Sequence, residues 1–472
     1  MSDATSLSSL KWARSVFCGA ELGDSRRTDR LILMASRAAA RPGGKISEVV
    51  LDAAERQGAY DFLEGEQVSA APVLRSVANA AFQCAEQHPF CFAAVDGSSL
   101  SLTDTQHKKG FGTVGSTGIG LKVITSLLVS PDGVLVGIAD QQWWARPARP
   151  KISRKAHRQL RLKARPHQKE TQHWLRAIEQ TCQRAQQAGV QLWFQLDREG
   201  DNRDYLSALA KCGHRFTVRG NWNRLVRSFG TSKDYLCEVL GRHKPIGSYE
   251  LDVPAGPGRR ARRSKMTVRA AQVTLILRDK WMKTATTLTL TAVITKEMRA
   301  PKGEKPLDWM LLTNAPVTTL PQAQQVIYGY AQRWRIEEFH KTWKTGACKS
   351  EETQLRSTQA VITWATILAA VATRIERLKR LSRTEPDQPA DIELSNVEIR
   401  ALLLLRREVN HRKEIRLNAM PTIGQATLWI AELGGYTGKS SGGPPGAITI
   451  RRGLEYLRPA TQLLESLGQN EK

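Results

Sequence analysis

Two aspartates directly follow apolar runs, and their carboxylates could bind metal ions. Asp96 follows the run Cys91–Val95, and Asp197 follows the run Val190–Leu196. Both runs have the length and composition of buried strands. Carboxylates at strand ends in an open α/β sheet project into the crevice where ligands bind. Aspartate is also common in turns, so neither position establishes a site by itself.

The second position has several acidic neighbours. Glu199, Asp201 and Asp204 all lie within seven residues of Asp197. Spacing does not choose among the four carboxylates. We favour Asp197 because it directly ends the apolar run, where a side chain leaves a strand towards a ligand crevice.

A third carboxylate, Glu337, lies in a segment whose pattern predicts one long helix over residues 321–345. Tyr330, Arg333, Glu337 and Lys344 follow one another at offsets of 0, 3, 7 and 14 residues. At about 3.6 residues per turn these offsets form one stripe of a helix. Such a stripe presents a carboxylate flanked by cations, which suits a phosphodiester. A salt-bridged amphipathic helix without chemistry would show the same spacing.

The elements around these residues predict a mixed α/β sheet. Further strands are expected over residues 121–129, 133–138 and 214–219. The first strands form a hairpin meander and the later ones alternate with helices, which is typical of a mixed sheet. Ribonuclease-H-like folds have a similar element order.

The flanking segments have other patterns. Residues up to about 70 have helical spacing, and residues 267–277 and 286–294 alternate as strands of a β-rich insertion. A polar linker is expected over residues 381–391, and helices over 397–408 and 424–432.

The charge balance indicates a polyanionic partner. Seventy Lys and Arg residues against forty-five Asp and Glu residues give a net charge of +25. Such a surface attracts nucleic acid first. The segment from Arg146 to Lys169 holds ten Lys and Arg residues and no acid. Charge runs are usually solvated, but beside a nuclease centre we expect this one to follow phosphates.

Composition excludes several other classes of protein. A hydrophobic share of 41% and a charged share of 24% exclude a disordered or fibrous chain. The seven cysteines form no CxxC pair, so neither a disulfide framework nor a thiolate zinc site is expected, and a reducing cytoplasm fits. Residues 1–11 lack the apolar core of a secretory signal. The apolar stretch Ala360–Ala372 is shorter than the roughly 20 residues that a bilayer requires, so we expect a buried helix and no membrane.

The helical stripe also carries a family resemblance. The pattern Y-x-x-R-x-x-x-E-x(6)-K, and the wider string RWRIEEFHKTWKTG, resemble the YREK signature of DDE transposases of the insertion-sequence-four family, in particular its transposon-five branch. Matching segments extend along almost the whole chain: WARSVF and LGDSRRTDRL within residues 12–31, GAYDF at 58–62, QWWARP at 142–147, LDREGDNRDYL at 196–206, FTVRG at 216–220, PKGEKPLDWMLLTNAPV at 301–317 and LWIAELGGY at 428–436.

The resemblance implies roles for particular residues. It implies that Asp96, Asp197 and Glu337 are the catalytic, metal-binding triad. The implied cofactor is Mg²⁺, two ions per active site, with Mn²⁺ as a substitute, and hard carboxylate oxygens suit both ions. The implied DNA contacts are Arg26, Arg27 and Arg30 at the end sequence, Arg219 at the transposon end, Trp309 under a flipped thymine, and Tyr330, Arg333, Trp334, Lys341 and Lys344. Of the last five, Arg333 and Lys344 can neutralise charge around the scissile phosphate.

The resemblance also implies an architecture and a reaction. The expected fold is α/β, with an RNase H-like (retroviral-integrase-like) mixed-sheet core, a β-rich insertion at about 220–313, and helical N- and C-terminal domains. The expected domains are 1–70 for DNA-end binding, 71–380 for catalysis and 381–472 for dimerisation. The implied protein is a cut-and-paste transposase that acts on double-stranded DNA, namely terminal inverted repeats and target DNA. It is expected to work as a homodimer through a hairpin intermediate in a bacterial-type cytoplasm, associated with the nucleoid.

Three alternatives remain at this point. The chain could be a catalytically silent or domesticated DNA-binding protein or inhibitor, although all three carboxylates, Arg333 and Lys344 are present. It could be a plain RNase-H-like nuclease or resolvase, which would not need the N-terminal arginines. Trp309, which precedes the apolar residues 310–312, could be a core tryptophan.

Overall fold

The computed structural model describes residues 9–106, 108–147, 169–227, 234–256, 258–278, 284–409, 420–438 and 443–470, with isolated positions between 153 and 159. The chain forms two compact units that interleave along the sequence. The first comprises Met1–His88, Gly97–Ala164 and Arg335–Lys472, and the second Pro89–Asp96 and Arg165–Trp334. The predicted domain boundaries near residues 70 and 380 stay a prediction.

The N-terminal part of the first unit is helical, as its spacing predicts. Its helices are α1 (Ser9–Phe17), α2 (Ser25–Ala40), α3 (Ile46–Val49), α4 (Ala53–Glu64) and α5 (Ala70–Ala85). Aspartates define two of the helix starts, because Asp24 accepts the Arg26 N–H and Asp52 accepts the Glu55 N–H. Helices α1 and α2 pack on each other, and α2 also packs on α4.

The same unit contains antiparallel strands β2 (Gly112–Val114), β3 (Gly118–Val129) and β4 (Leu135–Trp144). Helices α5 and α12 (Thr358–Thr384) both pack against β4. Helix α12 is long and apolar enough to cross a membrane, but 78% of its apolar window is buried inside the protein. This burial agrees with the core helix predicted around residues 360–372. The helix continues to Thr384, so the predicted linker over 381–391 begins later than expected.

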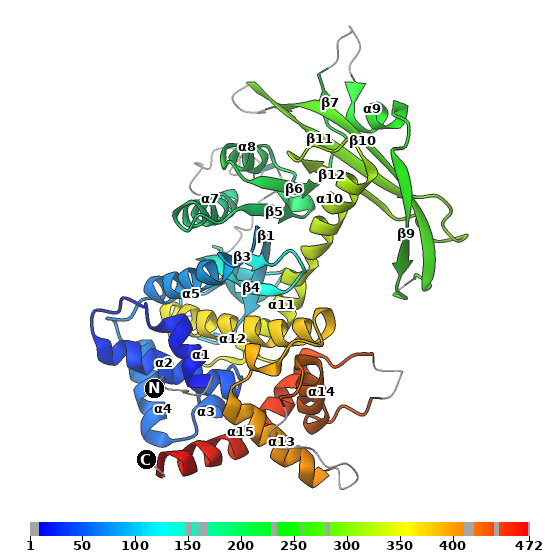
Figure 1. Ribbon diagram of the computed structural model, residues 1–472. Coiled ribbons are helices and arrows are strands. Elements are labelled where there is room, and N and C mark those ends of the chain that lie inside the picture. The colour runs from blue at the N-terminus through cyan, green and yellow to red at the C-terminus, as the bar shows by residue number, and fades with distance from the viewer. Residues whose placement is uncertain are drawn as a thin grey trace. The chain divides into compact units, whose positions relative to one another are not determined.

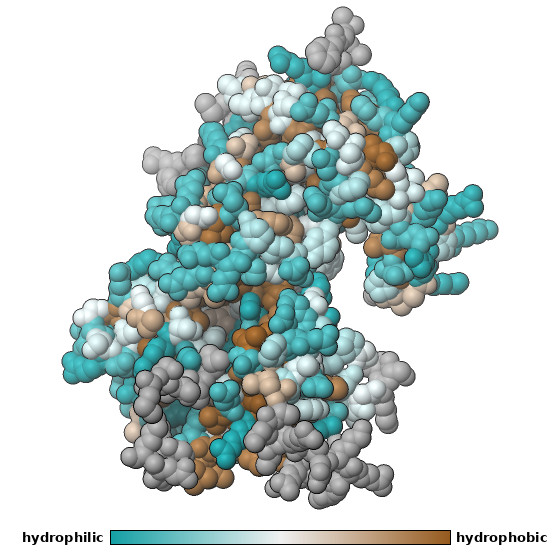
Figure 2. Space-filling view, viewed as in Figure 1, coloured by the Kyte–Doolittle hydropathy of each residue, from teal (hydrophilic) through white to brown (hydrophobic). Residues whose placement is uncertain are grey.

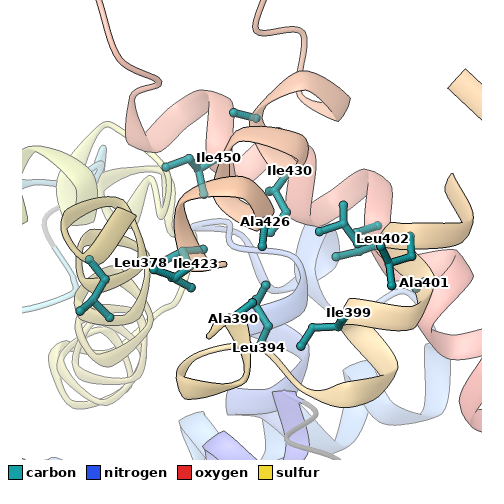
Figure 3. Packing of buried hydrophobic residues seen from close by; sticks show 14 of the residues in the cluster. Leu378, Ala390, Leu394, Ile399, Ala401, Leu402, Ile423, Ala426, Ile430 and Ile450 are labelled. Atoms are coloured by element: carbon teal, nitrogen blue, oxygen red, sulfur yellow. The ribbon is translucent and has the colours of Figure 1, made fainter. Parts of the chain in front are cut away.

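The C-terminal part of this unit packs around an apolar cluster that also includes Leu378 and Leu381 of α12. Helices α13 (Asn396–Val409), α14 (Ile423–Leu433) and α15 (Ala447–Asn470) surround it. Figure 3 shows Ile399, Ile423, Ile430 and Ile450 converging from these helices. The sequence pattern predicted α13 and α14 but not α15, which contains Gly453 and Pro459. Glycine is needed in α15 because a Cβ at that position would lie 1.7 Å from the Ile430 carbonyl oxygen of α14.

The second unit is built on strand β1 (Cys91–Ser101) up to Asp96, and on strands β5 (Leu192–Leu196) and β6 (Arg215–Arg219). Residues 91–95 of β1 pair in parallel with β5, and β5 pairs in parallel with β6. Helix α10 (Leu320–Gln332) packs on β5 and β6. Figure 1 shows α7 (Thr171–Gln187) and α8 (Arg203–Lys211) on the side of these strands away from α10. This mixed α/β arrangement agrees with the predicted sheet.

A disulfide joins the two helices on the outer side of these strands. Cys182 lies in α7 and Cys212 directly follows α8, and the two are paired. The sequence did not indicate this pairing, because the cysteines are 30 residues apart and only the packing of α7 on α8 brings them together. The expectation of a chain without disulfides is therefore corrected by this one bond.

The β-rich insertion extends the same sheet in antiparallel fashion. Strand β12 (Asp308–Thr313) pairs with β6, β11 (Ala285–Glu297) pairs with β12, and β10 (Arg262–Arg278) pairs with β11. Strand β9 (Gly247–Val253) pairs with β10, and the short strands β7 (Leu225–Val226) and β8 (Asp234–Tyr235) complete the set before helix α9 (Leu236–Arg242). The long β10–β11 hairpin agrees with the two alternating segments predicted there.

The single helix predicted over residues 321–345 is divided in the structure. Helix α10 ends at Gln332 and α11 (Trp334–Lys344) begins two residues later. Arg333, between them, keeps helical torsions but donates its N–H to the Tyr330 carbonyl, three residues back. This tighter turn interrupts the regular four-residue ladder. The stripe is therefore divided: Tyr330 lies in α10, Arg333 lies between the helices, and Glu337 and Lys344 lie in α11.

Candidate active site and nucleic-acid interface

Asp96 and Asp197 follow adjacent, in-register positions of two parallel strands. Val95 of β1 pairs with Leu196 of β5, so the two aspartates come next on neighbouring strands. Side chains alternate along a strand, which places Asp96 on the face of Phe92 and Asp197 on the face of Gln195. Both of those residues lie against Gly329 of α10, where an added Cβ would come within 2.7 Å of the Phe92 ring and 3.1 Å of the Gln195 amide nitrogen. The two carboxylates therefore share the face of the sheet that α10 covers.

One detail of the strand prediction is corrected. The apolar run ends at Asp96, but strand β1 continues to Ser101. Asp96 lies where pairing with β5 stops, rather than at the end of the strand. A strand continues beyond its buried run wherever backbone groups still find partners, and such partners are not visible in a local apolar pattern.

Arg333, which directly follows α10, forms an ion pair with Asp96 of β1. Its guanidinium contacts the Asp96 carboxylate at 3.3 Å, and only 6% of its side chain is exposed. The same guanidinium lies 5.8 Å from the centre of the Tyr330 ring and 5.3 Å from that of Trp334. Cation–π contacts and a carboxylate hold a buried arginine in one orientation. Tyr330 is buried, whereas 54% of Trp334 is exposed.

The acidic neighbours of Asp197 have different partners. Asp201 is buried, forms an ion pair with Arg224 and accepts the N–H groups of Asn221 and Trp222. Its carboxylate therefore fixes the loop after β6. Asp204 contacts Arg203, its neighbour on α8. Of the four acids, Asp197 is the one placed beside Asp96 by the strand register.

Glu337 lies in the first turn of α11, four residues after Arg333 along the chain, and belongs to the first unit. Within that unit, Lys344 at the end of α11 lies 3.6 Å from Glu351, and Glu351 also accepts the Ser101 N–H. Lys341 is exposed. Burial lowers the pKa of His340, on the same helix, to about 3, so this imidazole is neutral at physiological pH.

Trp309 lines an open cleft within the second unit. The cleft has a volume of about 580 Å³, and its walls include Arg198, Arg219, Arg259 and Lys305. The indole is half-buried, and its ring centre lies 6.4 Å from that of Tyr330. Arg219 donates to the Asp308 carbonyl at 3.3 Å. An aromatic face beside several cations can accept a base and its phosphates.

Sequence reasoning named Arg219 and Trp309 but missed Arg198, Arg259 and Lys305. Arg198 directly follows Asp197, and its position in that motif was the available signal. Arg259 and Lys305 lie in loops whose approach to Trp309 depends on the fold of the β insertion. Most of the basic run from Arg146 to Lys169 lies outside the described residues, so its expected role stays a prediction.

The three N-terminal arginines line one open pocket on the protein surface. Arg26, Arg27 and Arg30 line an open pocket of about 690 Å³ together with residues of α4 and the loop that follows it. Arg26 is exposed and pairs with Asp24 at 2.9 Å. Arg27 donates to the Leu22 carbonyl at 2.9 Å. The first turn of α2 thus presents clustered cations on the surface, as its sequence predicts. On the face shown in Figure 2, hydrophilic residues predominate and hydrophobic ones are scattered.

The described residues contain no cluster of three or more His, Cys, Asp or Glu side chains arranged to hold a metal ion. The second unit by itself supplies two adjacent carboxylates on one face, Asp96 and Asp197. Both are acceptor-only oxygen groups of the kind that Mg²⁺ prefers to nitrogen or sulfur. The donor chemistry of this pair therefore fits a divalent cation that takes further ligands elsewhere.

Three family models match successive parts of the chain. A transposase DNA-binding model matches residues 9–68, a transposase DDE domain model matches residues 151–374, and a transposase Tn5 dimerisation domain model matches residues 370–460. The first match covers the arginine cluster of α2. The second covers Asp197, Trp309 and Glu337 and begins after Asp96. The third extends from the middle of α12 into α15.

Proposed function

The chain belongs to the DDE transposases of the insertion-sequence-four family, in the transposon-five-like branch, and from that premise we propose that it catalyses cut-and-paste transposition. The observation that carries the proposal is the in-register placement of Asp96 and Asp197 on parallel strands, with Arg333 on Asp96. A core of this kind supports the ribonuclease-H-like, retroviral-integrase-like fold that DDE chemistry uses. Two carboxylates side by side with a buried cation suit a phosphodiester.

We propose that Glu337 completes a triad with these aspartates. This proposal is supported by the position of Glu337 in the sequence, because Glu337 follows Arg333 by four residues, about one helical turn. The triad would hold two Mg²⁺ ions, with Mn²⁺ as a substitute. When bound, such ions polarise the phosphate and stabilise the attacking and leaving oxygens of an in-line displacement. Arg333 and Lys344 would neutralise charge on the phosphate oxygens.

The proposed reaction has three displacements before strand transfer. In the first, water attacks the phosphate at the transposon end; it loses a proton, the bond to the 3′ oxygen breaks, and that oxygen leaves as a hydroxyl. In the second, this 3′-OH attacks the opposite strand, which joins the strands in a hairpin and releases the flanking DNA. A water opens the hairpin again, and the regenerated 3′-OH attacks target DNA.

Trp309 is proposed to receive the base that the hairpin displaces. Its half-buried indole lines an open cleft with Arg198, Arg219 and Arg259. An extruded base loses a few kcal/mol of stacking and pairing, and an aromatic face returns roughly 1–3 kcal/mol. Arginines on the same walls can contact the phosphates on either side of that base.

End recognition and pairing are proposed for the two terminal regions. Arg26, Arg27 and Arg30 would read the terminal inverted repeat, because they cluster on the first turns of α2 within the DNA-binding match. The C-terminal helices would pair two protomers, each holding one end of double-stranded DNA, since pairing two identical ends suits a two-fold dimer. The proposed location is a bacterial-type cytoplasm, in association with the nucleoid.

The test is cleavage of DNA that carries the element's own ends by the purified full-length protein with Mg²⁺. We expect nicked, hairpin and double-strand-break products in that order on a denaturing gel. Binding of the ends without any nick, in Mg²⁺ and in Mn²⁺, would instead identify the catalytically silent DNA-binding protein. Cleavage of DNA without regard to the end sequence would identify a plain nuclease.

A further inference from the structure

A buried network of ion pairs holds the loop over residues 298–307, which precedes Trp309 in the chain. Glu297, the last residue of β11, accepts two bonds from Arg262 of β10, at 2.8 and 3.0 Å. Arg262 also donates to Glu304 at 2.5 Å. Glu304 lies in the middle of the loop over residues 298–307 that connects β11 to β12. The network therefore joins the start of β10 and the end of β11, which lie at the same end of this antiparallel pair, to that loop.

The same glutamate also fixes the end of the loop. Its carboxylate accepts the Leu307 N–H at 2.9 Å, and its own N–H donates to the Leu307 carbonyl at 2.8 Å. The Ser264 hydroxyl contacts the carboxylate as well. Leu307 is two residues before Trp309. A shift of the Glu297 carboxylate would therefore displace the start of β12, where the indole is attached.

Burial keeps the Glu297 carboxylate away from any DNA surface, whereas Glu304 lines the Trp309 cleft with a small exposed fraction. The exposed fraction of the side chain is 0% for Glu297 and 12% for both Arg262 and Glu304. Hydrogen bonds from Arg262 lower the pKa of Glu297 to about 2, so the carboxylate is ionised at any pH used for cleavage. A buried, fully bonded ion network holds its elements in one geometry.

We propose that the Arg262–Glu297–Glu304 network is a positioning device for Trp309, and that it controls hairpin formation through the position of the indole. The inference rests on the stacking role of Trp309 in the proposed function. The loop that the network closes supplies Gly303 through Asp308 to one wall of the Trp309 cleft. A misplacement of about 1 Å at a reacting geometry is enough to cost orders of magnitude in rate.

The neighbouring strand position offers a matched control. Arg263, next to Arg262 on β10, forms an ion pair with Glu250 of β9 at 2.6 Å. Both side chains are exposed, by 71% and 58%. Glu250→Gln removes the same carboxylate charge, from the same sheet, without touching the loop over 298–307.

The experiment compares Glu297→Gln, Glu304→Gln, Glu250→Gln and Trp309→Ala in the full-length protein on end-bearing DNA with Mg²⁺. The readouts are the ratio of hairpin to nicked product and the fluorescence of 2-aminopurine placed at the bases of the transposon end. We expect both network variants to lower the hairpin-to-nick ratio by about tenfold and to reduce base extrusion. Glu250→Gln should match the wild type. A melting curve and end binding at fixed salt exclude a general folding defect.

The outcomes separate this inference from the proposed function. If Trp309→Ala leaves the ratio unchanged, the stacking role itself is wrong. If Trp309→Ala lowers the ratio but Glu297→Gln does not, the positioning role is overturned, and an effect of Glu304→Gln alone would show a direct DNA contact instead. The double variant Trp309→Ala/Glu304→Gln should be no worse than Trp309→Ala, because both changes act through one indole. An additive defect would also overturn the inference.

Discussion

Asp96 and Asp197 are set side by side by strand pairing alone, whereas Trp309, although paired with Thr295 of β11, follows a loop that is also held by side chains distant in sequence. The two aspartates follow the paired residues Val95 and Leu196 of parallel strands, so the backbone ladder alone sets them side by side. The approach to Trp309 depends on Arg262 bonding Glu297 and Glu304, across 35 and 42 residues. Both arrangements lie in one unit and one sheet.

This difference predicts how each of the two sites responds to substitution of its side chains. A backbone ladder is shared by many hydrogen bonds, so loss of one side chain removes chemistry and leaves the geometry. A side-chain network depends on every member, because a buried group without its partner is costly. Substitution of Asp197 should therefore affect catalysis alone, whereas substitution of Asp96 should also cost some stability because the buried Arg333 loses a carboxylate partner. Substitutions in the network should affect both stability and one selected step.

The largest effect is expected at the carboxylates. Asp96→Ala, Asp197→Ala or Glu337→Ala should reduce strand cleavage by about a thousandfold or more, because each removes a metal ligand. End binding should change little, because phosphate contacts elsewhere supply it. Cleavage assays beside gel-shift titrations check this. A variant that cleaves at nearly the wild-type rate would remove its residue from the triad.

The arginine cluster of α2 is more local than the aspartate pair, since its members lie within five residues of the sequence. Changing Arg26, Arg27 and Arg30 together to Ala should reduce the preference for end DNA over random DNA by about a hundredfold or more. Salt-sensitive binding to any DNA should persist, because the net charge of +25 supplies it. Competition binding at fixed salt measures the ratio. An unchanged ratio would make the cluster a structural surface.

Trp309→Ala should have a smaller and more selective effect. The first nick should proceed normally, and hairpin closure and opening should slow by about 5- to 150-fold, which corresponds to roughly 1–3 kcal/mol of lost stacking. Thermal stability should stay near that of the wild type, because the indole is only half-buried. A core tryptophan would instead lose roughly 3–5 kcal/mol of stability and lower all products together.

The two regions also differ in how much of their structure the sequence can predict. Asp96 and Asp197 were predictable because a buried strand has a local apolar pattern and a polar residue visibly ends it. The helices of the N-terminal region were predictable for the same local reason. The extension of β1 to Ser101 and the interruption at Arg333 were not, since both depend on partners supplied by other elements.

The network around Glu297 shows that limit most clearly. Glu297 ends an alternating strand and resembles any solvent-facing acid in the sequence, yet its side chain is fully buried. Only the pairing of Met266 with Glu297 across β10 and β11 brings it near Arg262. The Cys182–Cys212 disulfide and helix α15 were missed for the same reason, because tertiary packing created them.

Stability should distinguish the network from its surface neighbour. Glu297→Gln should lower the free energy of unfolding by about 1.5–3 kcal/mol, because Arg262 and the Leu307 N–H lose a charged acceptor. Glu250→Gln should change it by less than about 0.5 kcal/mol, because that pair is exposed. Urea titrations of both variants measure the difference. Equal effects would show that burial of the network does not stabilise the insertion.

The smallest effect concerns the pH dependence of that stability. Arg262 lowers the pKa of Glu297 to about 2 from an ordinary value of 4.5. A carboxyl whose folded pKa is lowered stabilises the protein fully above its unfolded pKa, and this stabilisation is lost as pH falls towards the folded pKa. The wild type should therefore exceed Glu297→Gln in stability by a constant margin from pH 7 to about pH 5, and the margin should shrink between about pH 4.5 and pH 2.

The difference between the two proteins is the quantity to measure, because other carboxylates titrate in both. Melting curves at half-unit pH steps, with Glu250→Gln as the control for charge, provide it. A margin that grows on acidification would mean that Glu297 is protonated in the folded protein and that Arg262 does not hold its charge.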